Sequence, residues 1–518
     1  METTSAANPP RKGIAVVHGI GSANESDTLL DIGQPLLEWV RRWLEIQDRQ
    51  ATFEGGVLAF SRTDDGRAEP IPHVRLELAG ARGCPPATWV MAEAWWSHSV
   101  RQPGFPVMVK WTIAHYIRVA GQWLHVLMRR AERLAGKQPG TSDPGFLARA
   151  IDALNTLALI PIFLVIGLVG FLVLILLYAA AQVPIKPVQD FIVVRILRNI
   201  LVVNVAQFRA FLDDEVQAAN MRRKLINALD FLANQCDCDD LYVIAHSGGA
   251  PVTVDLLCHP EGCAAVARVR KIFTLGEGLN KAWTLDPRKR RLWGPFPAGV
   301  GWVDFWTAYD PVPGGELRPP PAEGFTLPPD PRFVSEEVTH RMDVLSDHGG
   351  YWKNQEQVLW RVAQEIDADP FEASQFWAGN AMRVNRVRAM RWRVAALVAL
   401  RLEAIAAYLV ALIAVGWRLS DIGEAGWSLA GAVPGVNGLT QPIDTLVWMP
   451  GQGFATMAEG WGFLIFGAVV VALPFFALFR FLTQPIWDRW DRRERESSNY
   501  AAARSRIDVP CGPLQIDR

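Results

Sequence analysis

The sequence predicts an α/β fold in which a mostly parallel β-sheet is flanked by helices and extended by transmembrane helical hairpins. Short apolar runs bounded by turn residues alternate with helical stretches, which is typical of a parallel sheet covered by helices. Long segments without charged residues indicate the membrane part. Half of the 518 residues are hydrophobic and 20% are charged, so the composition is neither that of a disordered chain nor that of a collagen.

Apolar runs predict the strands of the sheet in order. The first, Ile14–Val17, is short and rich in β-branched residues, and glycines lie at both of its ends, as expected of a buried strand. Further strands are expected at Val57–Phe60, Val74–Leu78, Leu241–Ala245, Lys271–Leu275 and Val303–Ala308, and helices at Leu225–Ala233 and Asn354–Ile366.

A candidate nucleophile follows the strand predicted at Leu241–Ala245. The chain there reads Ala-His-Ser-Gly-Gly, which places Ser247 between Ala245 and Gly249. A serine held in a sharp turn from strand to helix needs small residues two positions away on either side, because larger ones would collide. The motif therefore predicts a nucleophile elbow, with alanine in place of the first glycine. We expect the side chain of His246, beside the nucleophile, to point away from it.

A serine hydroxyl needs a base to take its proton and an acid to orient that base. Asp310 comes directly after the strand predicted at Val303–Ala308, and Pro311 ends that strand and exposes the carboxylate on a turn. His348 lies in a glycine-containing loop that is free to reach over the strand ends. These residues are the expected acid and base, and Glu277, which follows the preceding strand, is the alternative acid.

The sequence His-Gly-Ile-Gly at positions 18–21 follows the first strand. We expect the backbone N–H groups of Ile20 and Gly248 to form an oxyanion hole, which stabilises the negative oxygen of a tetrahedral intermediate. His18 and Gly19 are expected to shape this loop rather than to transfer protons, and Gly249 is expected to shape the elbow.

Taken together, the motifs HGIG, AHSGG, YDPVP and SDHGGYW resemble those of the α/β-hydrolase superfamily, in its lipase and esterase branch. The resemblance covers roughly residues 13–150 and 206–370. It implies a serine hydrolase that cleaves carboxylic ester or thioester bonds through a Ser-His-Asp triad and an acyl-enzyme. The acid of this family normally follows a late strand, as Asp310 does.

Three apolar segments predict membrane helices. No charged residue interrupts Ala153–Ile185, and a spanning helix needs about 20 such residues. The other two segments, about 394–417 and 461–480, enclose a loop from Leu419 to Glu459 that has no Lys or Arg. Arginines cluster on the far side of each segment, between positions 383 and 393 and between 480 and 495. This asymmetry predicts that both ends of the hairpin are cytoplasmic.

The first apolar segment lies between Ile20 and Ser247 in the chain. If both residues belong to one site, the chain between them must cross the membrane an even number of times. Either Ala153–Ile185 crosses once and returns through Val188–Phe208, or it folds back on itself as a re-entrant loop. We favour the hairpin, with the two arginines of the returning segment facing headgroups or protein.

The predicted organisation has two interleaved parts. The hydrolase domain comprises residues 1–150, with the oxyanion strand, and 208–372, with the nucleophile, acid and histidine; a membrane hairpin at 151–207 interrupts it, and a C-terminal membrane domain follows at 373–518. Pro103–Arg130 is expected to be an amphipathic helix at the membrane surface, with packing on the sheet as the alternative. The hydrolase domain is expected to face the cytoplasm from an inner or plasma membrane.

Composition bears on partners and cofactors. The 52 basic and 53 acidic side chains give a net charge of −1, so no global basic field indicates nucleic acid as a partner. Six cysteines without a framework spacing indicate a reducing compartment. No set of His, Cys and carboxylate residues has metal-ligand spacing, and we expect neither a metal nor a cofactor.

These patterns predict a membrane-anchored serine hydrolase that acts on a lipid or an acylated small molecule, because a soluble ester would not require a tethered enzyme. Two alternatives remain open. One is a non-enzymatic membrane scaffold built on a hydrolase fold, since fold does not imply function. The other is a serine peptidase, because nothing in the sequence chooses between a peptide and an ester.

Overall fold

A computed structural model of the full chain provides the structure. It describes residues 11–21, 24–46, 51–55, 59–62, 68–78, 86–97, 100–101, 105–135, 146, 149–151, 153–160, 203–259, 263–286, 295–317, 325–329, 331–340, 346–367, 395, 398–399, 402–403, 405–406, 481, 484–485 and 488–489.

An eight-stranded, mostly parallel sheet forms the centre of the described chain, in the order β10-β9-β8-β7-β1-β6-β5-β2. Neighbouring strands from β10 to β6 run parallel, whereas β5 and β2 add two antiparallel pairs at one edge. The strands are β1 Arg11–Val17, β2 Ala51–Gly55, β5 His73–Leu78, β6 Ala87–Ala94, β7 Asp240–His246, β8 Val269–Leu275, β9 Gly301–Trp306 and β10 Phe333–Glu337. A separate two-stranded sheet pairs β3 Ala59–Arg62 with β4 Ala68–Ile71.

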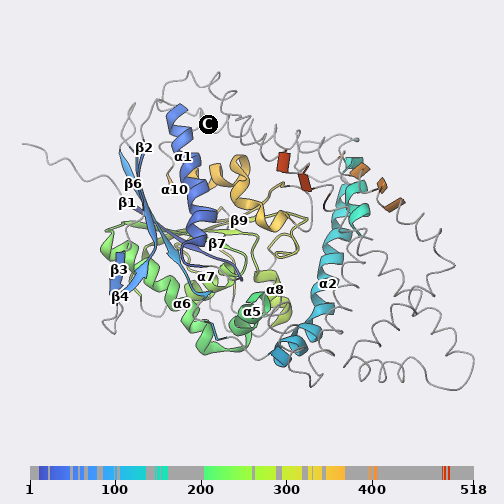
Figure 1. Ribbon diagram of the computed structural model, residues 1–518, viewed down its shortest axis with the longest axis horizontal. Helices are drawn as coiled ribbons and strands as arrows, with labels where there is room; N and C mark the ends of the chain where they lie inside the picture. The colour runs from blue at the N-terminus through green and yellow to red at the C-terminus, as the bar shows by residue number, and fades with distance from the viewer. Residues whose placement is uncertain are drawn as a thin grey trace, which may run out of the picture. The chain divides into compact units, whose positions relative to one another are not determined.

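Helices cover both faces of the sheet (Figure 1). On one face, α1 (Gln34–Ile46) and α10 (Trp360–Ile366) share an apolar cluster with alternate residues of the strands, such as Ile14 and Val16 of β1. On the other face, α6 (Glu215–Asp230) and α7 (Gly249–Cys258) contact β6, β1 and β7. Because both faces are covered, strands such as β6 are buried along their whole length.

The parallel arrangement brings several loops to the edge of the sheet that the carboxyl ends of its parallel strands form. The segments that follow β6, β1, β7, β8 and β9 all leave the carboxyl ends of neighbouring strands. Ligand sites of open α/β sheets lie at this edge. The short helix η6 (Asp347–Gly349), which follows β10, carries His348.

The predicted α/β class, with a mostly parallel sheet and flanking helices, is confirmed. The predicted strand at Val74–Leu78 exists, but it runs antiparallel to its neighbours. The predicted helix at Leu225–Ala233 is the end of the longer α6 and the π-helical turn η4 (Phe231–Gln235) that continues it. Strand β6 and helix α1 were not predicted.

The chain divides into two compact units. One comprises Met1–Gln102, Val203–Met390 and Asn499–Arg518, and the other comprises Pro103–Val202 and Arg391–Ser498. The first unit contains the sheet. The second contains α2 (Phe105–Ala135), the helix expected at Pro103–Arg130.

The predicted membrane segments lie mostly outside the described residues. This holds for Ala153–Ile185 beyond Ile160, for Val188–Phe208 before Val203, and for most of 394–417 and 461–480 together with the loop between them. Within the part of the chain that the structure describes, no helix combines the length and the apolar character needed to cross a membrane.

Candidate active site

Ser247 stands in a strained turn between β7 and α7. Its φ angle is +54°, in the left-handed region that costs a non-glycine residue free energy. The turn is held from both sides, because the N–H of Ser247 donates to the carbonyl of Leu275 and the carbonyl of Ser247 accepts from the N–H of Gly278. The sequence motif predicted this elbow, and the backbone has the strained geometry that the motif requires.

The loop after β1 lies directly against the elbow. A Cβ atom on Gly19 would come within 2.7 Å of the Cβ of Ser247, so only glycine permits this approach. A Cβ on Gly248 would lie 2.3 Å from Cγ1 and 3.2 Å from the backbone nitrogen of Ile20. The structure therefore brings Ile20 and Gly248, the two residues expected to supply the oxyanion donors, into close contact. Gly249, the first residue of α7, lies equally close to the carbonyl of His18.

His18 fixes the orientation of the loop at residues 18–21, named the oxyanion loop after its expected donor Ile20. Its Nε2 accepts from the backbone N–H groups of Trp96 and Ser97, each at 3.1 Å, so the proton of the neutral ring is on Nδ1. Nδ1 donates to the carbonyl of Gly19 at 2.6 Å. Because a peptide group is planar and trans, a fixed Gly19 carbonyl directs the N–H of Ile20 the opposite way. Burial lowers the pKa of His18 to about 4, so the ring stays neutral near pH 7.

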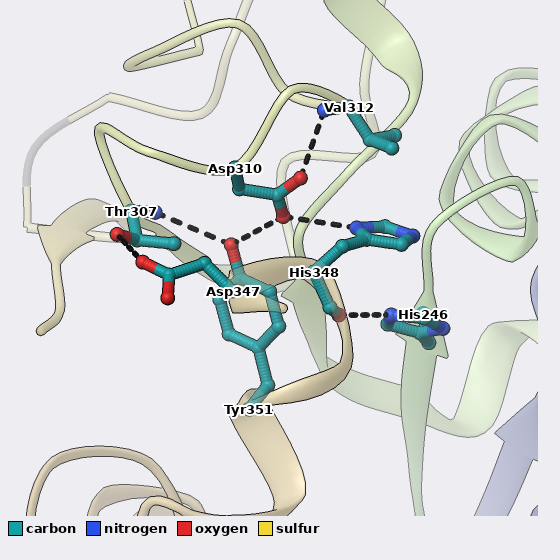
Figure 2. Close-up of polar contacts among 7 residues, drawn as sticks. All are labelled: His246, Thr307, Asp310, Val312, Asp347, His348 and Tyr351. Carbon is teal, nitrogen blue, oxygen red and sulfur yellow. Dashed lines mark hydrogen bonds and ion pairs between the residues drawn. The ribbon is translucent and has the colours of Figure 1, made fainter. Parts of the chain in front are cut away.

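Asp310 and His348 form a hydrogen-bonded pair, shown in Figure 2. Nδ1 of His348 lies 2.9 Å from Oδ2 of Asp310. The carboxylate also accepts from the hydroxyl of Tyr351 at 2.8 Å and from the N–H of Val312 at 2.8 Å. The carboxyl side chain is fully buried, whereas the imidazole is 27% exposed. The pair thus has the arrangement of an orienting acid and a solvent-facing base.

Partners rather than burial decide the charge of Asp310. Burial raises the pKa of its carboxyl, but the charge of His348 and the hydrogen bonds from His348, Val312 and Tyr351 outweigh burial and hold the pKa below its ordinary value. Asp310 is therefore ionised at neutral pH. An ionised acceptor requires the proton of neutral His348 on Nδ1, which leaves Nε2 with a lone pair for proton transfer.

The structure corrects the expectation for His246. Its ring does not point away from the site: the ring centroids of His246 and His348 are 4.6 Å apart, and Nε2 of His246 donates to the backbone carbonyl of His348 at 3.1 Å (Figure 2). Burial, together with the charge of His348, lowers the pKa of His246 to about 3. A neutral His246 thus ties the residue before the nucleophile to the backbone of the candidate base. Among the described contacts, no hydrogen bond joins the hydroxyl of Ser247 to His348.

Glu277, the alternative acid, has a different role in the structure. Its Oε2 accepts from the backbone N–H groups of Leu279 and Asn280 at the start of helix α8 (Leu279–Leu285). Burial, the charge of Asp304 and that of Asp310 raise the pKa of Glu277 well above its ordinary value. Its described hydrogen bonds do not include His348, so the geometry favours Asp310 as the acid.

Sequence reasoning did not single out Tyr351 as a site residue. This tyrosine lies within the motif SDHGGYW, in which only His348 was expected to be a site residue. Its hydroxyl accepts from the N–H of Thr307 and donates to Asp310. A polar hydroxyl at position i+3 from the candidate base, in a short turn, was the available signal.

In the described part of the chain, no group of three or more His, Cys, Asp or Glu residues has a geometry that would hold a metal ion. Neither protein-family models nor curated proteins match this chain in sequence.

Proposed function

We propose that this chain is a serine hydrolase that cleaves carboxylic ester or thioester bonds. The observation that carries the proposal is the bond between His348 and the ionised Asp310, at the same sheet edge as a serine held at φ +54°. Strain of this kind persists only where the surrounding structure enforces it, and it concentrates at functional sites.

In the proposed reaction, the hydroxyl oxygen of Ser247 attacks the carbonyl carbon of the substrate while Nε2 of His348 takes the hydroxyl proton. Asp310 orients the imidazole and stabilises its protonated form. The N–H groups of Ile20 and Gly248 donate to the oxygen that becomes negative. The protonated His348 then donates to the departing alcohol or thiol, which leaves an acyl group on Ser247, and water activated by His348 releases the acid.

Attack requires Nε2 of His348 to come within hydrogen-bond distance of the Ser247 hydroxyl. In free enzymes this bond is often long and shortens only when substrate is bound. The imidazole of His348 is 27% exposed, and the bonds of its Nδ1 and of its backbone carbonyl keep it beside Asp310 and His246 while Nε2 stays without a described partner.

Fluorophosphonate labelling tests the proposal, because these probes react with activated serines. The full chain in detergent should be labelled, and Ser247→Ala and His348→Ala should each abolish labelling. His259→Ala is the matched control, since His259 follows the far end of α7 and its ring contacts Asp255 of that helix. Absence of labelling in the folded wild type would overturn the proposal and favour the non-enzymatic scaffold.

We further propose a lipid or an acylated small molecule as the substrate class and a membrane as the site of action. The long uncharged segments of the sequence support this part. Hydrolysis of butyrate and palmitate esters, with and without anionic lipid vesicles, tests it. Preference for the long chain in the presence of vesicles is expected, and equal rates for a peptide amide would instead indicate a peptidase.

A further inference from the structure

The oxyanion loop has a second anchor that lies outside the catalytic motifs. Gln207, on helix α5 (Val203–Asp213), is 4% exposed and faces Gly21, the residue after the expected donor Ile20. Its Oε1 accepts from the N–H of Gly21 at 2.9 Å, and its Nε2 donates to the carbonyl of the same residue at 3.0 Å. One amide side chain thus binds both polar groups of a single backbone residue.

Ser97 completes this anchor. Its hydroxyl donates to the carbonyl of Gly21 at 3.1 Å and accepts from Nε2 of Gln207 at 3.2 Å. The backbone N–H of Ser97 also donates to His18. Gln207 and His18 therefore hold the loop at its two ends, and Ser97 contacts both.

We infer that Gln207 is a positioning residue for the oxyanion hole; this inference rests on the proposed function. His18 fixes the group that contains the Gly19 carbonyl and the Ile20 N–H, and Gln207 fixes the next group through the Gly21 N–H. With its own peptide group and the next one held, the Ile20 N–H keeps one direction.

The same contacts indicate which N–H group of the oxyanion loop can donate to a substrate oxygen. Because the N–H of Gly21 is bonded to Gln207, it is not available to a substrate oxygen. The backbone nitrogen of Ile20 instead lies next to the elbow, 3.2 Å from the position that a Cβ on Gly248 would occupy. Gln207 thus also determines which N–H of the loop serves as a donor, although it touches neither the substrate nor Ser247.

Two substitutions separate positioning from folding. Gln207→Glu keeps the shape and an acceptor for Gly21 N–H, but it places an oxygen against the carbonyl of Gly21. Gln207→Leu removes both bonds. Gln217→Leu is the matched control. Gln217, on α6, also accepts from a backbone N–H, that of Arg101, and its Nε2 donates to the Asp214 carboxylate. Neither of these bonds involves a site residue.

The measurements are kcat and KM for p-nitrophenyl butyrate per active site, with sites counted by fluorophosphonate titration, and the inhibition constant of an alkyl boronic acid. The boronic acid forms a tetrahedral adduct whose oxygen occupies the oxyanion hole. Both Gln207 variants should lower kcat by roughly 10- to 100-fold, since loss of one oxyanion donor costs about 10²–10³-fold. KM should change by less than about twofold and boronate affinity should fall with kcat, because the interaction forms only in the transition state.

Ser97→Ala provides a milder test if a Gln207 variant does not fold. The hydroxyl of Ser97 supplies one donor to Gly21, so kcat of this variant should fall less than kcat of the Gln207 variants.

A merely structural role of Gln207 would lower the number of titrated sites and leave kcat per site unchanged, and that result would overturn the inference. If wild type hydrolyses the ester and Ser247→Ala does not, normal kcat per site in the Gln207 variants refutes this inference alone. If wild type neither reacts with the probe nor hydrolyses the ester, the proposed function fails, and this inference with it.

Discussion

Two aspartates of the same strand region, Asp304 and Asp310, are equally buried yet have opposite pKa shifts. Asp304 lies within β9 and is 0% exposed, and Asp310, just after β9, is 1% exposed. Burial raises the pKa of Asp304 to about 7, whereas the pKa of Asp310 lies below its ordinary value. Burial alone therefore does not decide which carboxyl is charged at neutral pH.

The difference comes from the partners. Asp304 accepts from the hydroxyls of Thr274 and Ser335, its register neighbours on β8 and β10. Neutral hydroxyl donors only partly offset the cost of burying a charge. Asp310 instead faces His348, which becomes positively charged when it takes a proton. The two buried carboxyls thus differ in their partners, and their pKa values shift in opposite directions.

The largest expected effect comes from removing the charge of Asp310. Asp310→Asn should lower kcat for p-nitrophenyl butyrate by about 10⁴-fold, the loss seen when the triad aspartate of a serine protease becomes asparagine. Glu277→Gln is the matched control. Because burial raises the pKa of Glu277 well above its ordinary value and so favours its uncharged form, the uncharged amide of glutamine resembles it, and kcat should stay near that of the wild type. A large loss in Glu277→Gln together with near-normal kcat in Asp310→Asn would assign the acid role to Glu277 and break the comparison.

The candidate site was largely predictable because its main residues follow strand ends. Ser247 stands between small residues after an apolar run, and Asp310 precedes a proline after another. In a parallel sheet, such positions meet at one edge whatever the details of packing. Placing these residues near one another required only the strand order and the chain direction.

The remaining contacts depend on packing between distant segments. Gln207 and Gly21 are 186 positions apart, and no local pattern relates a helical glutamine to a glycine in a loop. The antiparallel direction of β5 was equally inaccessible, because alternation of apolar residues is the same in both directions. Strand β6 was not predicted, although Trp89–Ala92 is an uninterrupted apolar run. The Glu93 carboxyl near the end of this strand is buried and accepts from the N–H groups of Ser26 and Thr28, contacts that no local pattern indicates.

A second prediction tests the raised pKa of the Asp304 carboxyl. A carboxyl whose pKa is raised by folding binds more protons in the folded state than in the unfolded state, so the free energy of unfolding should fall as the pH rises from about 4 to about 7 and then level off. Asp304→Asn should remove this dependence and stabilise the protein at pH 8 by on the order of a few kcal/mol relative to its effect at pH 4.5. Asparagine can still accept from Thr274 and donate to Ser335.

Thermal unfolding followed by tryptophan fluorescence at pH 4.5, 6 and 8 measures this effect. Asp240→Asn is a suitable control, since Asp240 pairs with Arg270 at a partly exposed position at the start of β7. A wild type and an Asp304→Asn variant that differ by the same amount at each pH would show that Asp304 is charged throughout, and the contrast with Asp310 would then disappear.

The smallest expected effect concerns the donors that keep Asp310 charged. Tyr351→Phe removes one hydrogen bond to Asp310 and leaves the buried N–H of Thr307 without its acceptor. The free energy of unfolding should fall by about 1–3 kcal/mol at pH 7. Because the pKa of Asp310 is lowered by folding, its contribution to stability is present above about pH 4 and is lost as the pH falls through the folded pKa. The loss in the variant should therefore shrink below pH 4.

Tyr242→Phe separates this effect from the general cost of losing a buried hydroxyl. Tyr242 on β7 donates to the backbone carbonyl of Ile366, an acceptor that does not titrate. Its replacement should cost less and should cost the same at pH 3 and pH 7. If the two tyrosine variants have the same pH dependence, the hydroxyl of Tyr351 contributes nothing to the charge of Asp310, and the difference between the two aspartates must then come from His348 and the N–H of Val312 alone.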